Sequence, residues 1–89
     1  MAEARLKRAT GVGWQTFEGV AVLLNPERNL VHECNRVGTW VWERLDGKLS
    51  QPELLAGLIQ QFEIDEATAV GDLRQFANQL TELGLVVTV

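Results

Sequence analysis

The 89-residue sequence has a single cysteine, two prolines and no tyrosine. One cysteine cannot form a disulfide within the chain, which favours the reducing cytoplasm as its compartment. The sequence also has no run of about 18 apolar residues, the length needed to cross a bilayer, so no membrane span is predicted. A chain this short has one core and about one domain, which excludes a two-domain enzyme.

Basic residues are scarce in the second half of the chain. Residues 1–48 hold seven basic and six acidic side chains, whereas residues 49–89 hold Arg74 against six acidic ones. A segment this acidic is not drawn to phosphate backbones or anionic lipid by general attraction. We therefore expect neither nucleic acid nor a membrane surface as the partner.

Three short segments with the composition of strands come first. Trp14–Glu18 mixes aromatic and β-branched residues, and Val20–Leu24 is a short apolar run behind Gly19. A turn over Asn25–Asn29 has proline at its second position and reverses the chain. In Leu30–Cys34 alternate side chains face opposite sides, which predicts the third strand of an antiparallel meander.

Three helices follow, and each has a start signal. Asn35 is the N-cap of a short helix that stops at Asp46-Gly47, and a capping box begins the second helix at Ser50. Asp65 caps the third helix, and Gly84 closes it. Three strands followed by three helices predict an α+β fold similar to a winged helix-turn-helix unit.

The two ends of the chain differ in character. Residues 1–10 are predicted to form a flexible basic tail, and residues 11–89 a single domain. The apolar end Leu85–Val89 favours β-structure and could dock on the core. Trp40 and Trp42 point about 200° apart on one helix, so one of them is expected to be only partly buried.

The sequence contains little that indicates catalysis, metal binding or phosphate binding. His32 and Cys34 suggest a Cys–His nucleophile, but they lie nearly 7 Å apart along a strand with no orienting group nearby. One histidine and one cysteine supply two of the four ligands of a structural zinc. Gly11-Val12-Gly13 lacks the third glycine of a phosphate loop. We therefore predict a protein that is not an enzyme, with no catalytic residue, metal or cofactor.

The remaining candidate is the edge of the third strand, which carries no proline, lysine or glycine. An unpaired edge is either protected or used, and an extended peptide can add to it as a further strand. The third helix would wall a neighbouring groove. The predicted peptide-binding residues are Leu30, Val31, His32, Glu33 and Cys34 on the strand, and Val70, Arg74, Ala77, Asn78 and Thr81 on the helix.

Three alternatives remain open at this point. A helix could simply cover the strand edge and leave no site. The fold could be a nucleic-acid-binding winged helix, although the second helix has no basic residue and the third has Arg74 against three acidic ones, too few cations to neutralise several phosphates. The third strand could also pair with its copy across a two-fold axis, which would make the chain a homodimer.

The segment from Cys34 to Gly47 contains the string Asn-x-x-Gly-x-x-x-Trp-x-x-Leu-Asp-Gly, which resembles the PqqD-like family. The weaker matching segments are Ser50–Leu55, Phe62–Asp65, Asp72-Leu73 and Leu80–Val86, so the resemblance covers roughly residues 14–87. It implies a non-catalytic, winged-helix-like recognition element for a ribosomally made precursor peptide.

In that family the leader of the precursor lies as an added strand between the third strand and the third helix, and its core is presented to a maturation enzyme, often a radical S-adenosylmethionine (SAM) protein. The resemblance thus implies two partners, a leader peptide and a maturation enzyme. Arg74 is expected to meet an acidic leader residue.

The sequence departs from the family at Cys34, where leucine is common, so we expect a smaller pocket beneath the third strand. Leu23–Glu27 is similar to the members of pyrroloquinoline quinone synthesis, whereas Asn35–Gly47 is more similar to stand-alone relatives of other peptide pathways. The resemblance leaves the pathway open.

Overall fold

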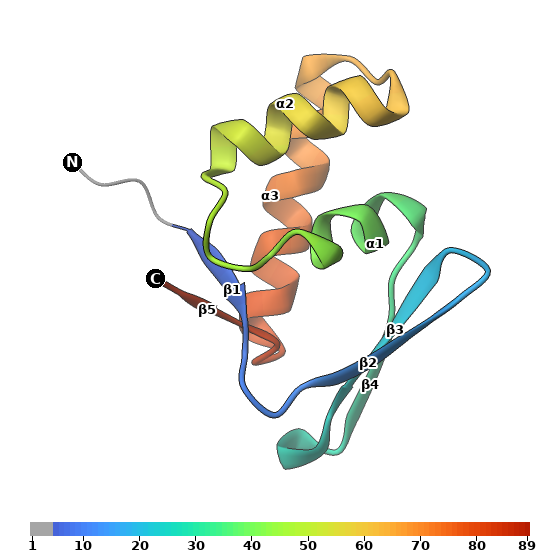
Figure 1. Cartoon of the computed structure of the whole chain (residues 1–89), viewed down its shortest axis with the longest axis vertical. Coiled ribbons are helices and arrows are strands. Elements are labelled where there is room, and N and C mark those ends of the chain that lie inside the picture. Colours follow the sequence, from blue (N-terminus) through green and yellow to red (C-terminus); the bar gives the residue numbers. More distant parts are fainter. Residues whose placement is uncertain (1–4) are drawn as a thin grey trace.

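The computed structural model describes residues 5–89 and has the predicted order of strands and helices, with one further strand at each end (Figure 1). In chain order the elements are β1 (Leu6–Arg8), β2 (Gly13–Phe17), β3 (Val20–Asn25), the 3-10 turn η1 (Pro26–Arg28), β4 (Leu30–Glu33), α1 (Arg36–Glu43), α2 (Gln51–Phe62), α3 (Glu66–Glu82) and β5 (Val86–Thr88). The predicted α+β class, with a three-stranded meander before three helices, is confirmed for this part of the chain. No helix in it has the length and apolar character needed to cross a bilayer.

The antiparallel sheet β2–β3–β4 is held in register by two tight connections. Glu18 and Gly19 join β2 to β3, and their φ angles of 52° and 81° are both positive. This combination belongs to the two-residue turn whose twist matches that of the flanking strands. η1 joins β3 to β4, starts with Pro26 and ends at Asn29 in the left-handed conformation, as the predicted reversal requires.

One face of the sheet packs against the helices, and the other lies open. On the packed face, Ala21 and Leu23 are fully buried. The Ala21 N–H donates to Thr39 Oγ1 of α1 at 2.8 Å, which ties β3 to the first helix. On the open face, Leu24 and Val31 are direct cross-strand partners, and both side chains are exposed.

Each helix begins at its predicted N-cap. The Asn35 side chain accepts a backbone N–H from the first turn of α1. Ser50 and Glu53 form the capping box of α2, and the hydrogen bonds from Ser50 lower the pKa of the Glu53 carboxyl. Asp65 accepts from the hydroxyl and the backbone N–H of Thr68, and these bonds lower the Asp65 pKa. Local capping chemistry therefore sets all three helix starts.

The core is centred on α1. The Trp42 side chain is fully buried, together with Leu58 of α2 and Leu80 of α3. Trp40 points elsewhere and is half-buried against Phe62 of α2, with the two ring centroids 6.3 Å apart. The expectation that one of the two tryptophans is only partly buried is confirmed.

The N-terminal segment corrects the prediction of a flexible tail over residues 1–10. Leu6–Arg8 form β1, which pairs antiparallel with β5, so the predicted docking of Leu85–Val89 is confirmed. Leu6 is 8% exposed, and Arg8 Nη1 donates to the Trp42 carbonyl at 2.8 Å. The tail prediction is wrong for residues 6–8. Although the composition of this segment is basic, the buried Leu6 side chain and the Arg8 hydrogen bond hold it against the domain. Residues 1–4 lie outside the described residues.

Candidate peptide-binding site

The candidate site is built around the open side of β4. The strand order is β2–β3–β4, so within residues 5–89 β4 pairs with β3 on one side and with no strand on the other. The terminal strands β1 and β5 form a separate two-stranded sheet. The terminal strands of the described part of the chain therefore do not pair with this edge, and within that part β4 presents unpaired backbone groups.

The register shows which backbone groups of β4 point outward. The Cys34 N–H donates to the Ala21 carbonyl at 2.8 Å. In an antiparallel pair, residues that exchange hydrogen bonds alternate with residues that do not. Leu30 and His32 therefore share the orientation of Cys34 and bond to β3. The N–H and C=O groups of Val31 and Glu33 point to the open edge.

The β4 side chains alternate as predicted. Leu30 and His32 are partly buried on the packed face, Cys34 is 3% exposed, and Val31 and Glu33 are exposed. Burial raises the pKa of the Cys34 thiol to about 11, so the thiol is protonated at neutral pH. Because the thiolate is the nucleophilic form, this environment opposes the Cys–His nucleophile considered from the sequence.

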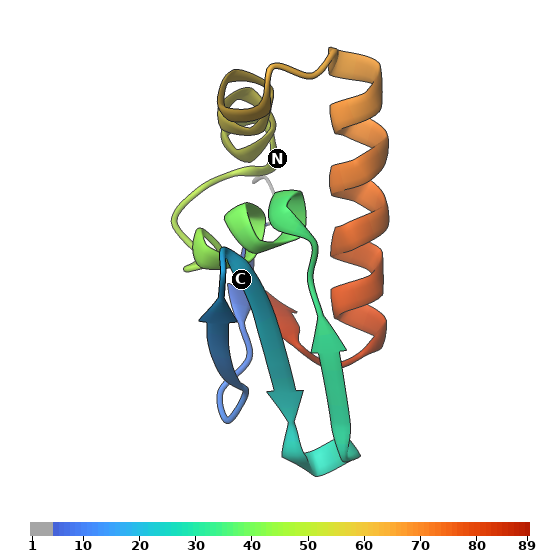
Figure 2. The same ribbon diagram turned by 90° about the vertical axis from the view of Figure 1, so that its right-hand side faces the viewer.

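Two anchors fix α3 relative to β4. In Figure 2 the elements follow one another across the view in the order β2, β3, β4, α3. At one end of β4, Arg28 Nη1 of η1 donates to the Glu82 carbonyl at 2.6 Å, and Asn25 Nδ2 donates to the Leu83 carbonyl at 3.1 Å. At the other end, Gly38 of α1 packs so closely on α3 that an added Cβ would lie 3.1 Å from Phe76.

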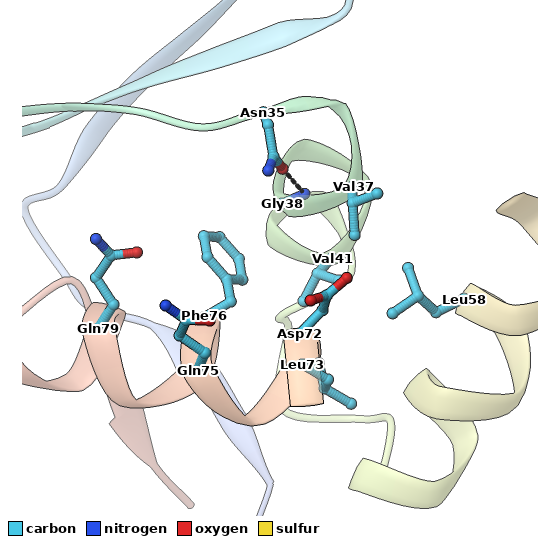
Figure 3. A pocket seen from close by; sticks show the side chains of 10 residues that line it. All are labelled: Asn35, Val37, Gly38, Val41, Leu58, Asp72, Leu73, Gln75, Phe76 and Gln79. Carbon is cyan, nitrogen blue, oxygen red and sulfur yellow. Dashed lines mark hydrogen bonds between the residues drawn. The ribbon is translucent and has the colours of Figure 1, made fainter. Parts of the chain in front are cut away.

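A pocket of about 240 Å³ lies where the chain passes from β4 into α1 (Figure 3). In Figure 3 the Phe76 ring extends from α3 toward Gly38 and Asn35. The pocket is lined by residues of three helices and the N-cap of α1, namely Asn35, Val37, Gly38, Val41, Leu58, Asp72, Leu73, Gln75, Phe76 and Gln79. The part of α3 that approaches the end of β4 therefore carries Phe76 and Gln79.

The helix residues predicted for the groove lie elsewhere. A second pocket, of about 420 Å³, is lined by Gln51, Pro52, Leu55, Val70, Leu73, Arg74, Ala77 and Asn78. It lies between α2 and α3, and it includes four of the five predicted α3 residues. The fifth, Thr81, is exposed, and its hydroxyl donates to the Ala77 carbonyl.

The structure thus places the two halves of the predicted site apart, with four of the five predicted α3 residues on the flank that faces α2. Successive residues turn by about 100° around a helix, so Arg74 and Phe76 point about 200° apart. Val70, Arg74 and Ala77 face the start of α2, whereas Phe76 faces α1. Phe76 belongs to the apolar stripe of α3 formed with Ala69, Leu73 and Leu80, and it is only partly buried. A large aromatic residue at the edge of this stripe is the sequence signal that could have indicated which flank of α3 approaches β4.

Metal binding has no evident basis in residues 5–89, which contain no group of three or more histidine, cysteine, aspartate or glutamate side chains that could hold an ion. The site offers backbone donors and acceptors on β4, an aromatic ring on α3 and neighbouring amide side chains. This is the chemistry of peptide recognition by main-chain pairing and side-chain pockets.

Comparison with known proteins agrees with this fold. The chain superposes on a solved structure described as "TbiB1 in Complex with the TbiA(beta) Leader Peptide", with a TM-score of 0.81 and 22% sequence identity. The match covers 90% of this chain and 93% of the other. No curated protein sequence matches. The sequence model of one family, however, matches residues 21–86, which is most of the chain, and the resemblance found in the sequence is confirmed: this chain belongs to the family described as Coenzyme PQQ synthesis protein D (PqqD).

Proposed function

We propose that this chain is a peptide-binding adaptor that holds the leader of a ribosomally made precursor peptide as a strand added to β4. Membership of the PqqD family supports this role. The fold shared with TbiB1, whose structure holds the TbiA(beta) leader peptide, supports it as well.

The observation that carries the proposal is the open edge of β4. Val31 and Glu33 each direct one N–H and one C=O outward, so an extended peptide can form up to four main-chain hydrogen bonds there. Such bonds give affinity with little regard to sequence. Selectivity has to come from side chains beside the edge.

The flank of α3 that approaches the end of β4, with Phe76 and Gln79 in the lining of the first pocket, provides those side-chain contacts. Leader residues directly opposite Val31 and Glu33 project toward the open face of the sheet. The residues between them project toward the packed face, where Leu30, His32 and the flank of α3 with Phe76 lie. We therefore expect a leader with apolar residues two positions apart, because every second side chain points toward the packed face and this flank of α3.

The adaptor leaves the chemistry to a maturation enzyme that receives the bound precursor, and the PqqD-like character favours a radical SAM protein in that role. The chain itself needs no catalytic residue for this task. Binding takes place in the reducing cytoplasm, which the unpaired thiol of Cys34 favours. Two copies joined at β4 would compete with the leader for the same edge.

A direct test first searches the neighbouring genes for a short precursor reading frame and then uses the leader that it encodes. A fluorescein-labelled synthetic leader should bind with saturable anisotropy and one-to-one stoichiometry. Replacing two apolar residues at alternate positions by serine should weaken binding at least tenfold, because each such side chain contributes about 1.5–3 kcal/mol when buried. A scrambled leader of the same composition is the control. Equal binding of the leader and its scrambled form would contradict the proposal.

A further inference from the structure

The pocket between α2 and α3 is a second concave site that the leader proposal does not use. It has a volume of about 420 Å³, and Pro52, Leu55, Val70, Leu73 and Ala77 give it a mainly apolar lining. Gln51 and Asn78 add carboxamides, and Arg74 is the charged residue of the lining. The pocket lies on the flank of α3 that points away from Phe76. A strand held on β4 therefore leaves it free.

Arg74 differs from most arginines of the chain. Four of the six donate to backbone carbonyls of their own chain, namely Arg5, Arg8, Arg28 and Arg44. The ion pair formed within residues 5–89 joins Arg44 to Glu43, so the exposed Arg74 has no carboxylate partner in that part of the chain. Its guanidinium lies at the border of an apolar hollow and forms neither a hydrogen bond nor an ion pair with the described residues.

This combination selects a particular ligand chemistry. An apolar hollow accepts an aliphatic or aromatic side chain, and a guanidinium recognises a carboxylate through two parallel hydrogen bonds. Residues 49–89 carry six acidic side chains against Arg74, so a strongly acidic segment would be repelled. A single carboxylate next to an apolar side chain fits both the hollow and its surroundings.

We propose that the α2–α3 pocket docks a segment of the maturation enzyme in which an apolar side chain stands beside one carboxylate. The identity of this partner rests on the adaptor function proposed above. The two sites lie on opposite flanks of α3, so the leader and the enzyme bind at the same time. The chain then brings the precursor to the enzyme without either ligand displacing the other.

The pocket chemistry is tested on the protein alone by two-dimensional 1H–15N NMR. N-acetylphenylalanine is the probe, and N-acetylphenylalanine amide is the uncharged control. The acid should give saturable shifts at Leu55, Val70 and Ala77, and it should bind up to about fivefold more tightly than the amide, as a solvated ion pair allows. Arg74→Gln should abolish the difference between the two probes. Arg36→Gln, an arginine outside the pocket, should preserve it.

The result that overturns the inference is the absence of saturable shifts, or shifts confined to β4 and Phe76. Ala77→Met provides a second variant, because it fills the hollow and should weaken both probes without removing Arg74. If the acid and the amide bind equally to the unaltered protein, the carboxylate assignment fails.

The partner is tested with the purified maturation enzyme and the labelled leader. Arg74→Gln should weaken binding of the enzyme about twofold to fivefold, as loss of a solvated ion pair allows, while the leader affinity stays constant. A fall in leader affinity would make the pocket part of the leader site and overturn the inference. If the unaltered chain sediments as a dimer and the Arg74→Gln variant as a monomer, the occupant of the pocket is a second copy of the chain. That result would overturn the enzyme assignment. If the probe binds the pocket but the leader does not bind the chain, the adaptor function fails while the pocket chemistry stands.

Discussion

Proline substitution along β4 separates the backbone groups that bind peptide from those that hold the sheet. The N–H of Val31 points to the open edge, whereas the N–H of His32 points to β3. Proline removes the N–H in either case and is tolerated best on an edge strand. We expect Val31→Pro to impair leader binding and His32→Pro to impair folding.

The size of each effect follows from the hydrogen bond that is lost. Val31→Pro removes one donor to the leader and leaves a leader carbonyl unpaired, which weakens binding by about 1–3 kcal/mol, or roughly fivefold to 150-fold. The Val31 side chain is 66% exposed, so its loss changes the core little. His32→Pro instead breaks the pairing with Leu23 and should lower the free energy of unfolding by about 1–3 kcal/mol.

The assay combines leader anisotropy with urea unfolding for each variant. Val31→Thr keeps the N–H and the β-branched shape, and its leader affinity should stay within about 0.5 kcal/mol of the unaltered chain. Unchanged leader affinity in a folded Val31→Pro variant would refute the role of this edge. Equal losses of stability in the two proline variants would refute the alternation of backbone groups.

Three further predictions concern the core, the groove and the N-terminal strand. Burial raises the pKa of the Cys34 thiol from 9.0 to about 11, so between these pH values the folded chain keeps the proton that the unfolded chain loses. The free energy of unfolding should therefore fall by up to about 3 kcal/mol between pH 9 and 11, as measured by urea unfolding. The Cys34→Ala variant should lack this decrease. Phe76→Leu keeps an apolar side chain against α1 but removes ring surface, and should weaken the leader by about 1 kcal/mol in anisotropy titrations; equal affinity would place the leader away from this flank. Leu6→Ala should lower the free energy of unfolding by about 2–3 kcal/mol, whereas an unstructured N-terminus would leave it unchanged.

Local chemistry made most of the fold predictable. The caps at Asn35, Ser50 and Asp65 and the turn at Pro26 depend on hydrogen bonds and dihedral limits within a few residues, so their positions follow from the sequence. β1 was not predictable in this way. It is three residues long, and its partner β5 is the last strand of the chain, so no local pattern marks the pairing.

For a related reason, the sequence predicts the β4 part of the candidate site but not the part on α3. The alternation in β4 identifies an edge strand and its exposed side chains. The apolar stripe of α3 shows which face is buried, but it has two flanks, and the sequence does not tell which one faces β4. That choice depends on long-range contacts, namely Arg28 with Glu82 and Gly38 with Phe76. The sequence therefore did not show that the flank with Val70 and Arg74 lies against α2.

Amide hydrogen exchange at β4, followed by NMR with and without leader, tests the central claim most directly. The N–H groups of Val31 and Glu33 should exchange rapidly in the free protein and become protected when the leader is saturating. Those of His32 and Cys34 should be protected in both states, because they bond to β3. Val31 and Glu33 amides that are already protected in the free chain, or that stay unprotected under saturating leader, would contradict strand addition at this edge.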